Sequence, residues 1–172
     1  MHAQVIDFIK RMRASSMGKA ITAARRILEQ GSYNINGSAK PLFSIEAEYV
    51  GVDWRAGPGV DVVCLMHKYR EKPDGYFDFV LSTEVLEHDP KWAASLQRLT
   101  ELLAPKGSML ITCAGPGRHA HEHDTAPQRG YYCNQTMGQL TVSLLSLARF
   151  NVMVLEDDAE ACDLRLFAWR KK

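Results

Sequence analysis

The feature that most constrains the fold of this chain is a series of short apolar runs that alternate with longer segments of helical pattern. The runs with the length and composition of strands are 26–29, 49–53, 60–65, 77–81, 108–113, 150–155 and 164–169. The segments that read as helices are 3–24, 90–103 and 136–148. Strands that alternate with helices are typical of a parallel sheet covered on both faces. The sequence therefore predicts an α/β fold with a mostly parallel sheet of about seven strands.

The connection between the second and third predicted strands is unusually short. Only residues 54–59 separate these two strands, whereas a parallel crossover normally needs a dozen or more residues and usually contains a helix. Six or seven extended residues span at most about 24 Å, which is enough to return along a short strand. The composition Arg-Ala-Gly-Pro-Gly fits a loop. We therefore expect a shortened, non-helical crossover at this point, or a very short strand on one side of it.

Length and charge limit the classes of protein to which the chain can belong. Its 172 residues suit a single domain, which we expect to span 1–172 with 1–24 as an N-terminal helical segment. The formal net charge of +1 argues against a domain that binds nucleic acid over its whole surface. No apolar run approaches the ~20 residues that a membrane span needs, so we expect a cytoplasmic protein without a membrane partner. Because residues 3–26 are basic, a contact with RNA or an acidic substrate remains an alternative to a solvated helix face.

The four cysteines are widely spaced and form no CxxC pair: Cys64, Cys113, Cys133 and Cys162. Cys64 and Cys113 lie in apolar runs of strand type. We interpret the cysteines as buried, reduced thiols.

Three of the predicted strands end in residues suited to binding a ligand. Glu29-Gln30-Gly31-Ser32 follows the first strand, Asp53 ends the second, and Ser82-Thr83-Glu84 follows the fourth. In an open parallel sheet, ligands bind beyond the carboxyl ends of the strands, where the strand order reverses. Glycine permits a tight turn and a close backbone approach, and an acid at a strand end is placed to accept hydrogen bonds from a ribose diol. The three strand ends together predict a nucleotide-type crevice.

These segments resemble the class I S-adenosylmethionine-dependent methyltransferases, over roughly Arg26 to Cys113 and more weakly to the end of the chain. "RILEQGSYNINGS" resembles the first motif of that family, and "YVGVDWRAGPGVDVV" its second strand with the ribose-binding acid. "FDFVLSTEVLEHDP" and "LLAPKGSMLITCAGPG" are similar to the fourth and fifth strands, and "RGYYCNQT" resembles a late lid segment. The resemblance implies a Rossmann-like fold, S-adenosylmethionine as cofactor and methyl transfer as the reaction.

The resemblance also implies which residues form the cofactor site. They are Glu29, Gly31, Ser32, Tyr33, Gly37, Asp53, Trp54, Leu65, Met66, Ser82 and Thr83. Glu29 and Gly31 would frame the methionine end of the cofactor, and Asp53 would hold its ribose hydroxyls. Trp54 would lie against the adenine, which Leu65-Met66 would edge. Ser82 and Thr83 would line the pocket near the sulfonium.

Two positions depart from the family pattern. The usual first-motif loop has glycines at alternate positions, but Tyr33 and Ile35 occupy the two later ones here. We interpret Asn36-Gly37-Ser38 as part of a different loop shape, which some members share. An acid that often contacts the adenine amino group is replaced by Leu65.

Methyl transfer is an in-line displacement, so we expect alignment to dominate and a base to assist where the acceptor is a hydroxyl or an amine. The candidate catalytic residues are His123, His88 and Glu84, and the loop also carries His119 and His121. For His88, a structural hydrogen bond at the start of a helix is the alternative interpretation. The His119–Asp124 cluster could bind zinc, but no matching second cluster is evident, so we expect no metal.

Other interpretations remain for the class of protein. A nucleotide-dependent reductase would need G-x-G-x-x-G after the first strand, and the chain lacks it. A degenerate domain that binds or scaffolds without catalysis is the main alternative to an enzyme. The sequence has no N-P-P-Y run and no Pro-Cys nucleophile of the kinds that DNA-base methylation uses. We therefore expect a small-molecule or sugar acceptor; one sequence does not determine the oligomeric state.

Overall fold

The strands form one mixed sheet. The structure, a computed structural model, describes residues 3–120, 131–148 and 150–170. Within these ranges a seven-stranded sheet has the order β3-β2-β1-β4-β5-β7-β6. Its strands are β1 (Arg26–Gln30), β2 (Glu48–Asp53), β3 (Val62–Val63), β4 (Phe77–Thr83), β5 (Leu103–Ala114), β6 (Phe150–Asp158) and β7 (Asp163–Arg170). β7 runs antiparallel to both of its neighbours, and the pairs among β1–β5 are parallel. The prediction of a mostly parallel α/β sheet of about seven strands is confirmed.

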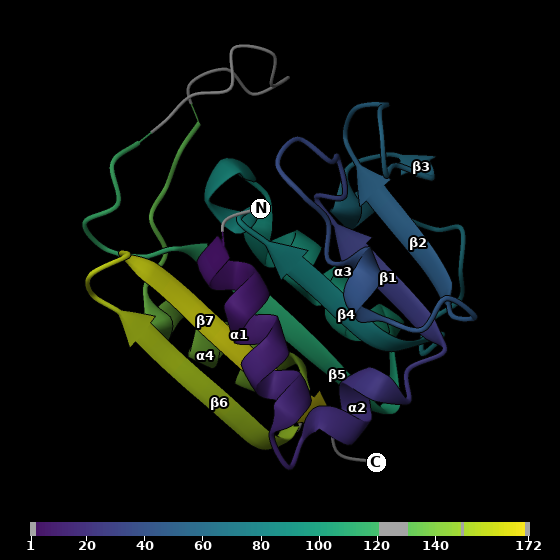
Figure 1. The fold of residues 1–172 in the computed structure, drawn as a ribbon. Helices are drawn as coiled ribbons and strands as arrows, with labels where there is room; N and C mark the ends of the chain where they lie inside the picture. The colour runs from purple at the N-terminus through teal and green to yellow at the C-terminus, as the bar shows by residue number, and fades with distance from the viewer. Residues whose placement is uncertain (1–2, 121–130, 149, 171–172) are drawn as a thin grey trace.

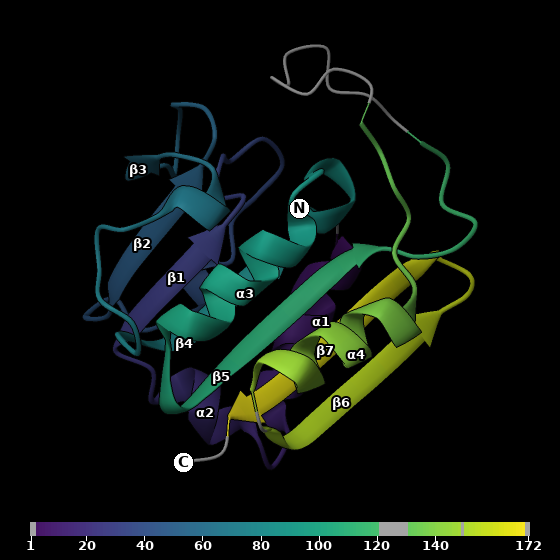
Figure 2. The same ribbon diagram turned by 180° about the vertical axis from the view of Figure 1, so that it is seen from behind.

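Helices cover both faces of this sheet. α1 (Ala3–Ala14) and α2 (Gly18–Thr22) lie on one face, and α3 (Trp92–Leu102) and α4 (Met137–Leu147) lie on the other (Figures 1 and 2). Short 3-10 turns η1 (Lys40–Leu42), η2 (Met66–Lys68) and η3 (Leu86–His88) occupy three of the connections. Each face therefore has its own buried apolar cluster, one under α1 and one between the sheet and the helices α3 and α4.

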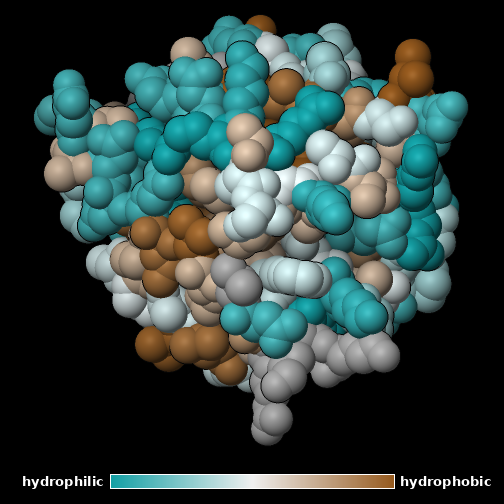
Figure 3. Space-filling model, turned by 60° about the horizontal axis from the view of Figure 1, so that its bottom comes forward, coloured by the Kyte–Doolittle hydropathy of each residue, from teal (hydrophilic) through white to brown (hydrophobic). Residues whose placement is uncertain are grey.

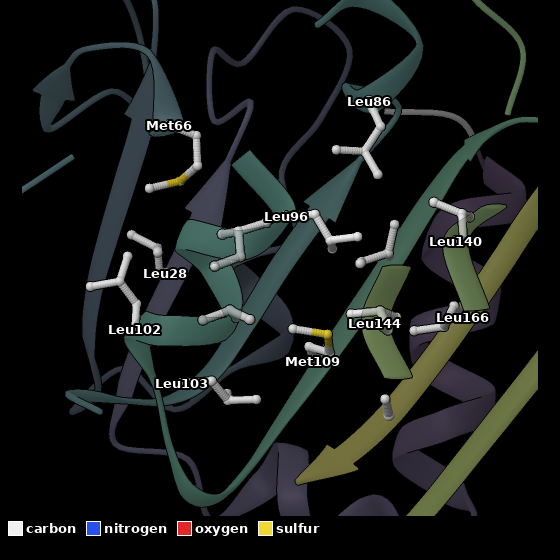
Figure 4. Close-up of a cluster of buried hydrophobic side chains, with 14 of the residues drawn as sticks. Leu28, Met66, Leu86, Leu96, Leu102, Leu103, Met109, Leu140, Leu144 and Leu166 are labelled. Carbon is white, nitrogen blue, oxygen red and sulfur yellow. The ribbon is translucent and has the colours of Figure 1, made fainter. Parts of the chain in front are cut away.

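The side chains of the cluster under α3 and α4 come from the sheet and from both of these helices. Leu28 of β1, Leu96 and Leu102 of α3, and Leu144 of α4 point into one continuous space (Figure 4). Met66 of η2 reaches the same cluster and is 3% exposed. This cluster packs α3 and α4 against β1, the strand that precedes the first predicted ligand-binding turn.

The N-terminal helix is amphipathic in the way the sequence predicts. Its buried residues are Val5, Phe8, Ile9 and Met12, which follow the i, i+3, i+4, i+7 spacing of one helix face. The expected interruption near Ser15 is confirmed, because the Ser15 hydroxyl donates to the Met12 carbonyl at 2.7 Å and the helix restarts at Gly18. A Cβ at Gly18 would lie 1.8 Å from the Arg13 carbonyl oxygen, so the two helices can meet only at a glycine.

The basic N-terminal segment is largely neutralised by acids of the sheet. Arg11 forms a two-pronged ion pair with Glu156 at 2.7 and 2.9 Å, and Arg26 pairs with Asp78 at 2.6 Å. Figure 3, which brings the lower end of Figure 1 forward, shows a mainly hydrophilic surface with some apolar patches. This pairing favours the interpretation of a solvated, ion-paired helix face over that of an RNA-binding patch.

The short crossover after β2 is a loop, as expected. Residues 54–61 contain no helix, and the Asn34 N–H donates to the Pro58 carbonyl at 2.8 Å. The predicted third strand, 60–65, is too long: β3 has two residues, which pair with Val52 and Asp53. The ladder ends there because the chain turns into η2, and the Cys64 N–H makes the last bond, to the Asp53 carbonyl.

Several other boundaries differ from the sequence prediction. β5 begins at Leu103 instead of 108, because Leu103 already pairs with Phe77 before a bulge at Lys106, whose φ is 69°. α4 begins after Thr136, whose side chain accepts from the Gln139 N–H in a capping box. β6 runs to Asp158 because it pairs with β7 along its whole length.

The structure tests the predictions about the cysteines and about membrane-spanning helices. All four cysteines are free, but only Cys113 is buried; Cys133 is exposed, and Cys64 and Cys162 are half-buried. The expectation of buried thiols is therefore wrong for three of them, since they lie beyond the sheet ladder or in loops. Across the residues that the structure describes, no helix is long and apolar enough to cross a bilayer.

A matched pair of leucines on α4 tests this packing. Leu144 is 0% exposed and Leu145 is 56% exposed, although both lie in the same helix. We expect Leu144→Ala to lower the free energy of unfolding by about 2–5 kcal/mol, because it removes buried contacts and leaves a cavity. Leu145→Ala should change it by less than about 1 kcal/mol. Urea unfolding of both variants measures the difference, and equal losses would mean that α4 does not pack on the sheet as described.

Candidate active site

Parallel pairing brings the three predicted strand ends to one edge of the sheet. β1 lies between β2 and β4, with Gln30 beside Val52 on one side and Ser82 on the other. The Gly31 N–H donates to the Val52 carbonyl at 2.8 Å, and the Glu84 N–H donates to the Thr112 carbonyl at 2.9 Å. The turns that follow β1, β2 and β4 therefore share one crevice edge, as the sequence predicts.

Gly31 is required by the geometry of its turn. Its φ is 78°, in the left-handed region that favours glycine. A Cβ at this position would also lie 2.2 Å from Cγ2 of Val85, which follows β4. The turn after β1 is thus in direct contact with the turn after β4, and any larger residue would push the two apart.

Asp53 lies at the end of β2 with its carboxylate held by two backbone groups. Oδ2 accepts from the Tyr33 N–H at 3.3 Å, and Oδ1 accepts from the Arg55 N–H at 3.1 Å. Burial raises the pKa of Asp53, and the backbone N–H groups lower it in part. A carboxylate offers about four acceptor positions, so two remain for a bound ligand.

Aromatic and cationic side chains stack beside Asp53. The Arg55 guanidinium lies 3.9 Å from the centroid of the Tyr33 ring and 5.3 Å from that of Trp54. A Cβ at Gly57 would lie 1.8 Å from Cε2 of Tyr33, so the ring also contacts the loop backbone. Tyr33 stands where the family pattern has its second glycine, and here its side chain joins the loop after β1 to the loop after β2. Sequence reasoning missed Arg55, because an arginine beside an aromatic residue is too common to be a signal.

Glu29 is a buried acid on β1. It is 3% exposed, and its Oε2 accepts a hydrogen bond from the Tyr49 hydroxyl at 2.8 Å. Burial raises the pKa of Glu29 to about 7, against the lowering effect of that hydrogen bond. Glu29 is therefore an acid poised between its two protonation states near neutral pH.

Small hydroxyl side chains line the same edge. Ser32 and Ser82 are buried, and within the described residues neither Oγ has a hydrogen-bond partner. Thr83, the last residue of β4, is also buried. Buried polar atoms without partners are uncommon in folded proteins, and a bound ligand is one of the recognised reasons for them.

Two of the predicted cofactor residues, Met66 and Gly37, make no contact with this group in the structure, and a third, Leu65, follows the short strand beside Asp53. Met66 points into the apolar core, so its side chain serves packing (Figure 4). Leu65, which precedes it, is half-buried. Gly37 is exposed with a φ of 119°, and no atom would lie within 4 Å of a Cβ there.

The turn after β4 brings two acids together. Glu84 has a φ of 56°, and its Oε1 accepts from the Thr112 hydroxyl at 2.8 Å. Glu87, in η3, is 1% exposed, and among the described residues no side chain hydrogen-bonds to its carboxyl group. Burial, with a contribution from the nearby Glu84, raises the pKa of Glu87 to about 8. The His88 ring packs edge-on against Tyr132, with centroids 5.1 Å apart.

An arginine that sequence reasoning missed lies beside these acids. Nη1 of Arg118 pairs with Asp163 at 2.5 Å, and Nη2 lies 3.9 Å from Oε2 of Glu84. The arginine follows β5, while the aspartate begins β7, so antiparallel pairing of the two strands brings them together. The one signal in the sequence for Arg118 is its position directly after the loop residues Gly115-Pro116-Gly117.

The histidine loop is only partly described. His119 is exposed, whereas His121 and the candidate base His123 lie outside the described residues. In the part of the chain that the structure describes, no three His, Cys, Asp or Glu side chains are arranged to hold a metal ion.

Comparison with known proteins identifies the family. The sequence profile of the family described as "Methyltransferase domain" matches residues 2–150. Among curated proteins, no sequence matches this one significantly.

Solved structures share the fold at low sequence identity. The 1,6-didemethyltoxoflavin-N1-methyltransferase of Burkholderia thailandensis, solved with 1,6-didemethyltoxoflavin and S-adenosylhomocysteine, has a TM-score of 0.68 at 18% identity, over 98% of this chain and 79% of that one. Phosphoethanolamine N-methyltransferase 2 of Haemonchus contortus, in complex with S-adenosyl-L-methionine, has a TM-score of 0.69 at 18% identity, over 98% and 52%. The cyclase SpnF has a TM-score of 0.66 at 13% identity, over 98% and 80%.

The profile covers most of the chain, whereas the solved structures establish the fold alone. Its strand order and the residues at its carboxyl edge agree with that family. The chain therefore belongs to the methyltransferase-domain family.

Proposed function

We propose that this protein transfers the methyl group of S-adenosylmethionine to a small-molecule or sugar acceptor at the carboxyl edge of β4 and β5. The observation that carries the proposal is Asp53, a largely buried carboxylate with acceptor positions left over beside the Gly31 turn. Two of the solved neighbours are named as N-methyltransferases, one of a toxoflavin precursor and one of phosphoethanolamine. Their acceptors are small molecules, which supports the same class here.

The residues at this edge fit the chemical groups of the cofactor. A ribose diol supplies hydroxyl donors, which suit the remaining acceptor positions of Asp53. The cofactor's ammonium group suits Glu29, and binding a cation would favour the ionised form of that acid. The unpartnered hydroxyls of Ser32 and Ser82 can donate to ligand atoms. Trp54, Tyr33 and Arg55 supply flat surfaces for the adenine.

The proposed work of the protein in the reaction is mainly alignment. When bound, the cofactor supplies an activated methyl group on a sulfonium centre. Holding the acceptor atom in line with that methyl group accounts for about 7–11 kcal/mol of the barrier in well-aligned systems. The turns after β4 and β5 would hold the acceptor, and the segment 131–136 would cover it and exclude water. Thr83 and the candidate bases Glu84 and His88 lie on this side of the crevice.

A binding or scaffold role without catalysis is the second candidate function. Tyr33 favours it, because the ring stacks on Arg55 and contacts Gly57 where the family pattern has a glycine. The neighbouring cyclase fold also illustrates that this architecture does not by itself specify methyl transfer. Glu29 and Asp53 favour catalysis, since a pure scaffold has no use for buried acids at a ligand-binding edge. Measurable cofactor binding without turnover over a broad acceptor panel would select the scaffold.

Calorimetric titration with S-adenosylmethionine and S-adenosylhomocysteine tests the cofactor site. We expect micromolar binding to the wild type and at least tenfold weaker binding to Asp53→Ala, because hydrogen bonds to a charged group contribute about 1.5–3 kcal/mol. Asp157→Ala, at an exposed acid of β6, is the matched control and should bind like the wild type. Asp53→Asn, which keeps one carbonyl acceptor, should fall between the two. No binding by folded wild-type protein would refute the proposed function.

The pH dependence of stability tests the burial of Glu29. Its pKa in the folded protein, about 7, lies above the ordinary value of 4.5, so folding favours the protonated acid. This group therefore lowers stability progressively as pH rises from about 4.5 through 7. Glu29→Gln keeps an acceptor for Tyr49 but never ionises. We expect the variant to be more stable than wild type at pH 8, by up to roughly 3 kcal/mol, with the difference vanishing near pH 4.5.

Urea unfolding at both pH values measures this difference, with Glu160→Gln as the exposed control. Cofactor binding should move in the opposite direction and weaken in Glu29→Gln, because the cofactor ammonium loses its counter-charge. A stability difference that is the same at both pH values would show that Glu29 does not ionise in the folded protein.

A further inference from the structure

The carboxyl group of Glu87 is the most costly unexplained group in the described structure. It is 1% exposed. Within the described residues no side chain hydrogen-bonds to this carboxyl group, although the backbone N–H groups of Glu87 and Ala114 act on it and lower its pKa in part. A buried carboxyl without side-chain partners opposes folding, whether it is charged or neutral.

Glu87 lies on the acceptor side of the crevice. η3 follows the turn after β4, and the Glu87 carbonyl accepts the Cys133 N–H at 2.9 Å. The Gln135 N–H bonds in turn to the Ala114 carbonyl at the end of β5 at 2.9 Å. The segment 131–136 is thus bonded to η3 and to the end of β5, on the side of the crevice where the proposed function places the acceptor.

The charges around Glu87 leave an excess of negative charge. The titratable groups that face it are Glu84, His88, Cys113, Arg118, Tyr132 and Asp163. Arg118 is closest to Asp163, at 2.5 Å, and lies 3.9 Å from Glu84. Arg118 is within ion-pair distance of both of these acids and also lowers the pKa of Glu87 in part, as the weakest of the contributions that act on this carboxyl group. An anionic acceptor group would be repelled here, whereas a cation would be attracted.

We propose that Glu87 binds a protonated amine of the acceptor through its buried carboxyl group and takes up its proton before methyl transfer. This inference rests on the proposed function and names its acceptor as an amine. An ammonium group fits because it offers several N–H donors and the missing positive charge, whereas a hydroxyl offers one donor and no charge. Among sugars, the proposal selects amino sugars.

The proton and the electrons balance in this scheme. The bound ammonium gives one proton to the Glu87 carboxylate and becomes a neutral amine with a free electron pair. That pair attacks the methyl carbon of S-adenosylmethionine, so an N–C bond forms while the C–S bond breaks with its electrons left on sulfur. The products are an N-methylammonium and S-adenosylhomocysteine, and Glu87 returns its proton to water when they leave. Because burial raises the pKa of Glu87 to about 8, the proton transfer from an amine is not strongly uphill.

Infrared difference spectroscopy tests the site without knowledge of the acceptor. The S-adenosylhomocysteine complex is titrated at pH 7 with methylammonium, methanol, acetate or magnesium chloride, and the carbonyl band of the protonated acid is assigned by its loss in Glu87→Gln. We expect methylammonium alone to remove the band. A band unaffected by methylammonium, or removed by magnesium in the same way, would overturn the proposal; the magnesium result would identify a divalent-cation site.

Turnover with matched acceptor pairs provides the second test. Glucosamine with glucose, and ethanolamine with ethylene glycol, differ only in one amine or hydroxyl, and release of S-adenosylhomocysteine is the readout. We expect methylation in the amine member of a pair and a loss of about 100-fold or more in kcat for Glu87→Gln, with cofactor affinity unchanged. Wild-type turnover should rise with pH through about 8, and the variant should lose this rise.

Two controls separate the possible failures. Glu160→Gln, at an exposed acid, should match the wild type in every assay. Glu87→Gln should fold at least as stably as wild type above pH 8, because it removes a buried charge. Methylation of the alcohol members would refute the amine while leaving the proposed function intact, whereas absence of cofactor binding in wild type would refute the proposed function itself.

Discussion

The parallel pairing of β1 between β2 and β4 is the constraint on which the rest of the structure depends. Because the three strands run in one direction, their carboxyl ends meet at one edge, and the turns of Gly31, Asp53 and Glu84 become neighbours. The contact between Gly31 and Val85 allows no Cβ, so the two turns also fix each other's position. The helices on both faces stabilise this pairing and contribute little to the edge itself.

Two buried acids near this edge lower the free energy of unfolding of the protein. Glu29 and Glu87 are both buried acids with raised pKa values, and within the described residues neither has a cationic side chain bonded to it. Apolar residues at the two positions would pack without this penalty. Two such acids at the ends of neighbouring strands are easier to explain by ligands that carry positive charge than by folding. On this view the cofactor's ammonium and the acceptor's amine supply the charges that the folded protein lacks.

The sequence predicts the strands and their ends well, because short apolar runs have few alternatives in a chain of this length. It predicts β3 poorly, since the pattern of 60–65 does not reveal that the ladder ends at Val63. The sequence does not predict the stacking of Arg55 on Tyr33 or the pairing of Arg118 with Asp163, because the partners in each pair are far apart along the chain. Glu87 was visible as part of a motif, but its lack of side-chain hydrogen-bond partners within the described residues is a property of the folded structure alone.

The altered loop after β1 has a physical explanation in these contacts. Where the family pattern has a second glycine, Tyr33 stacks on Arg55, contacts Gly57 and donates its N–H to Asp53. The following Asn34 bonds to Pro58 of the same crossover. The shortened crossover has no helix to hold it, so the tyrosine ring and these two backbone bonds take over that task. Tyr33 in place of a glycine and a crossover without a helix are therefore structurally compatible, and the Tyr33 N–H keeps the Asp53 carboxylate in position.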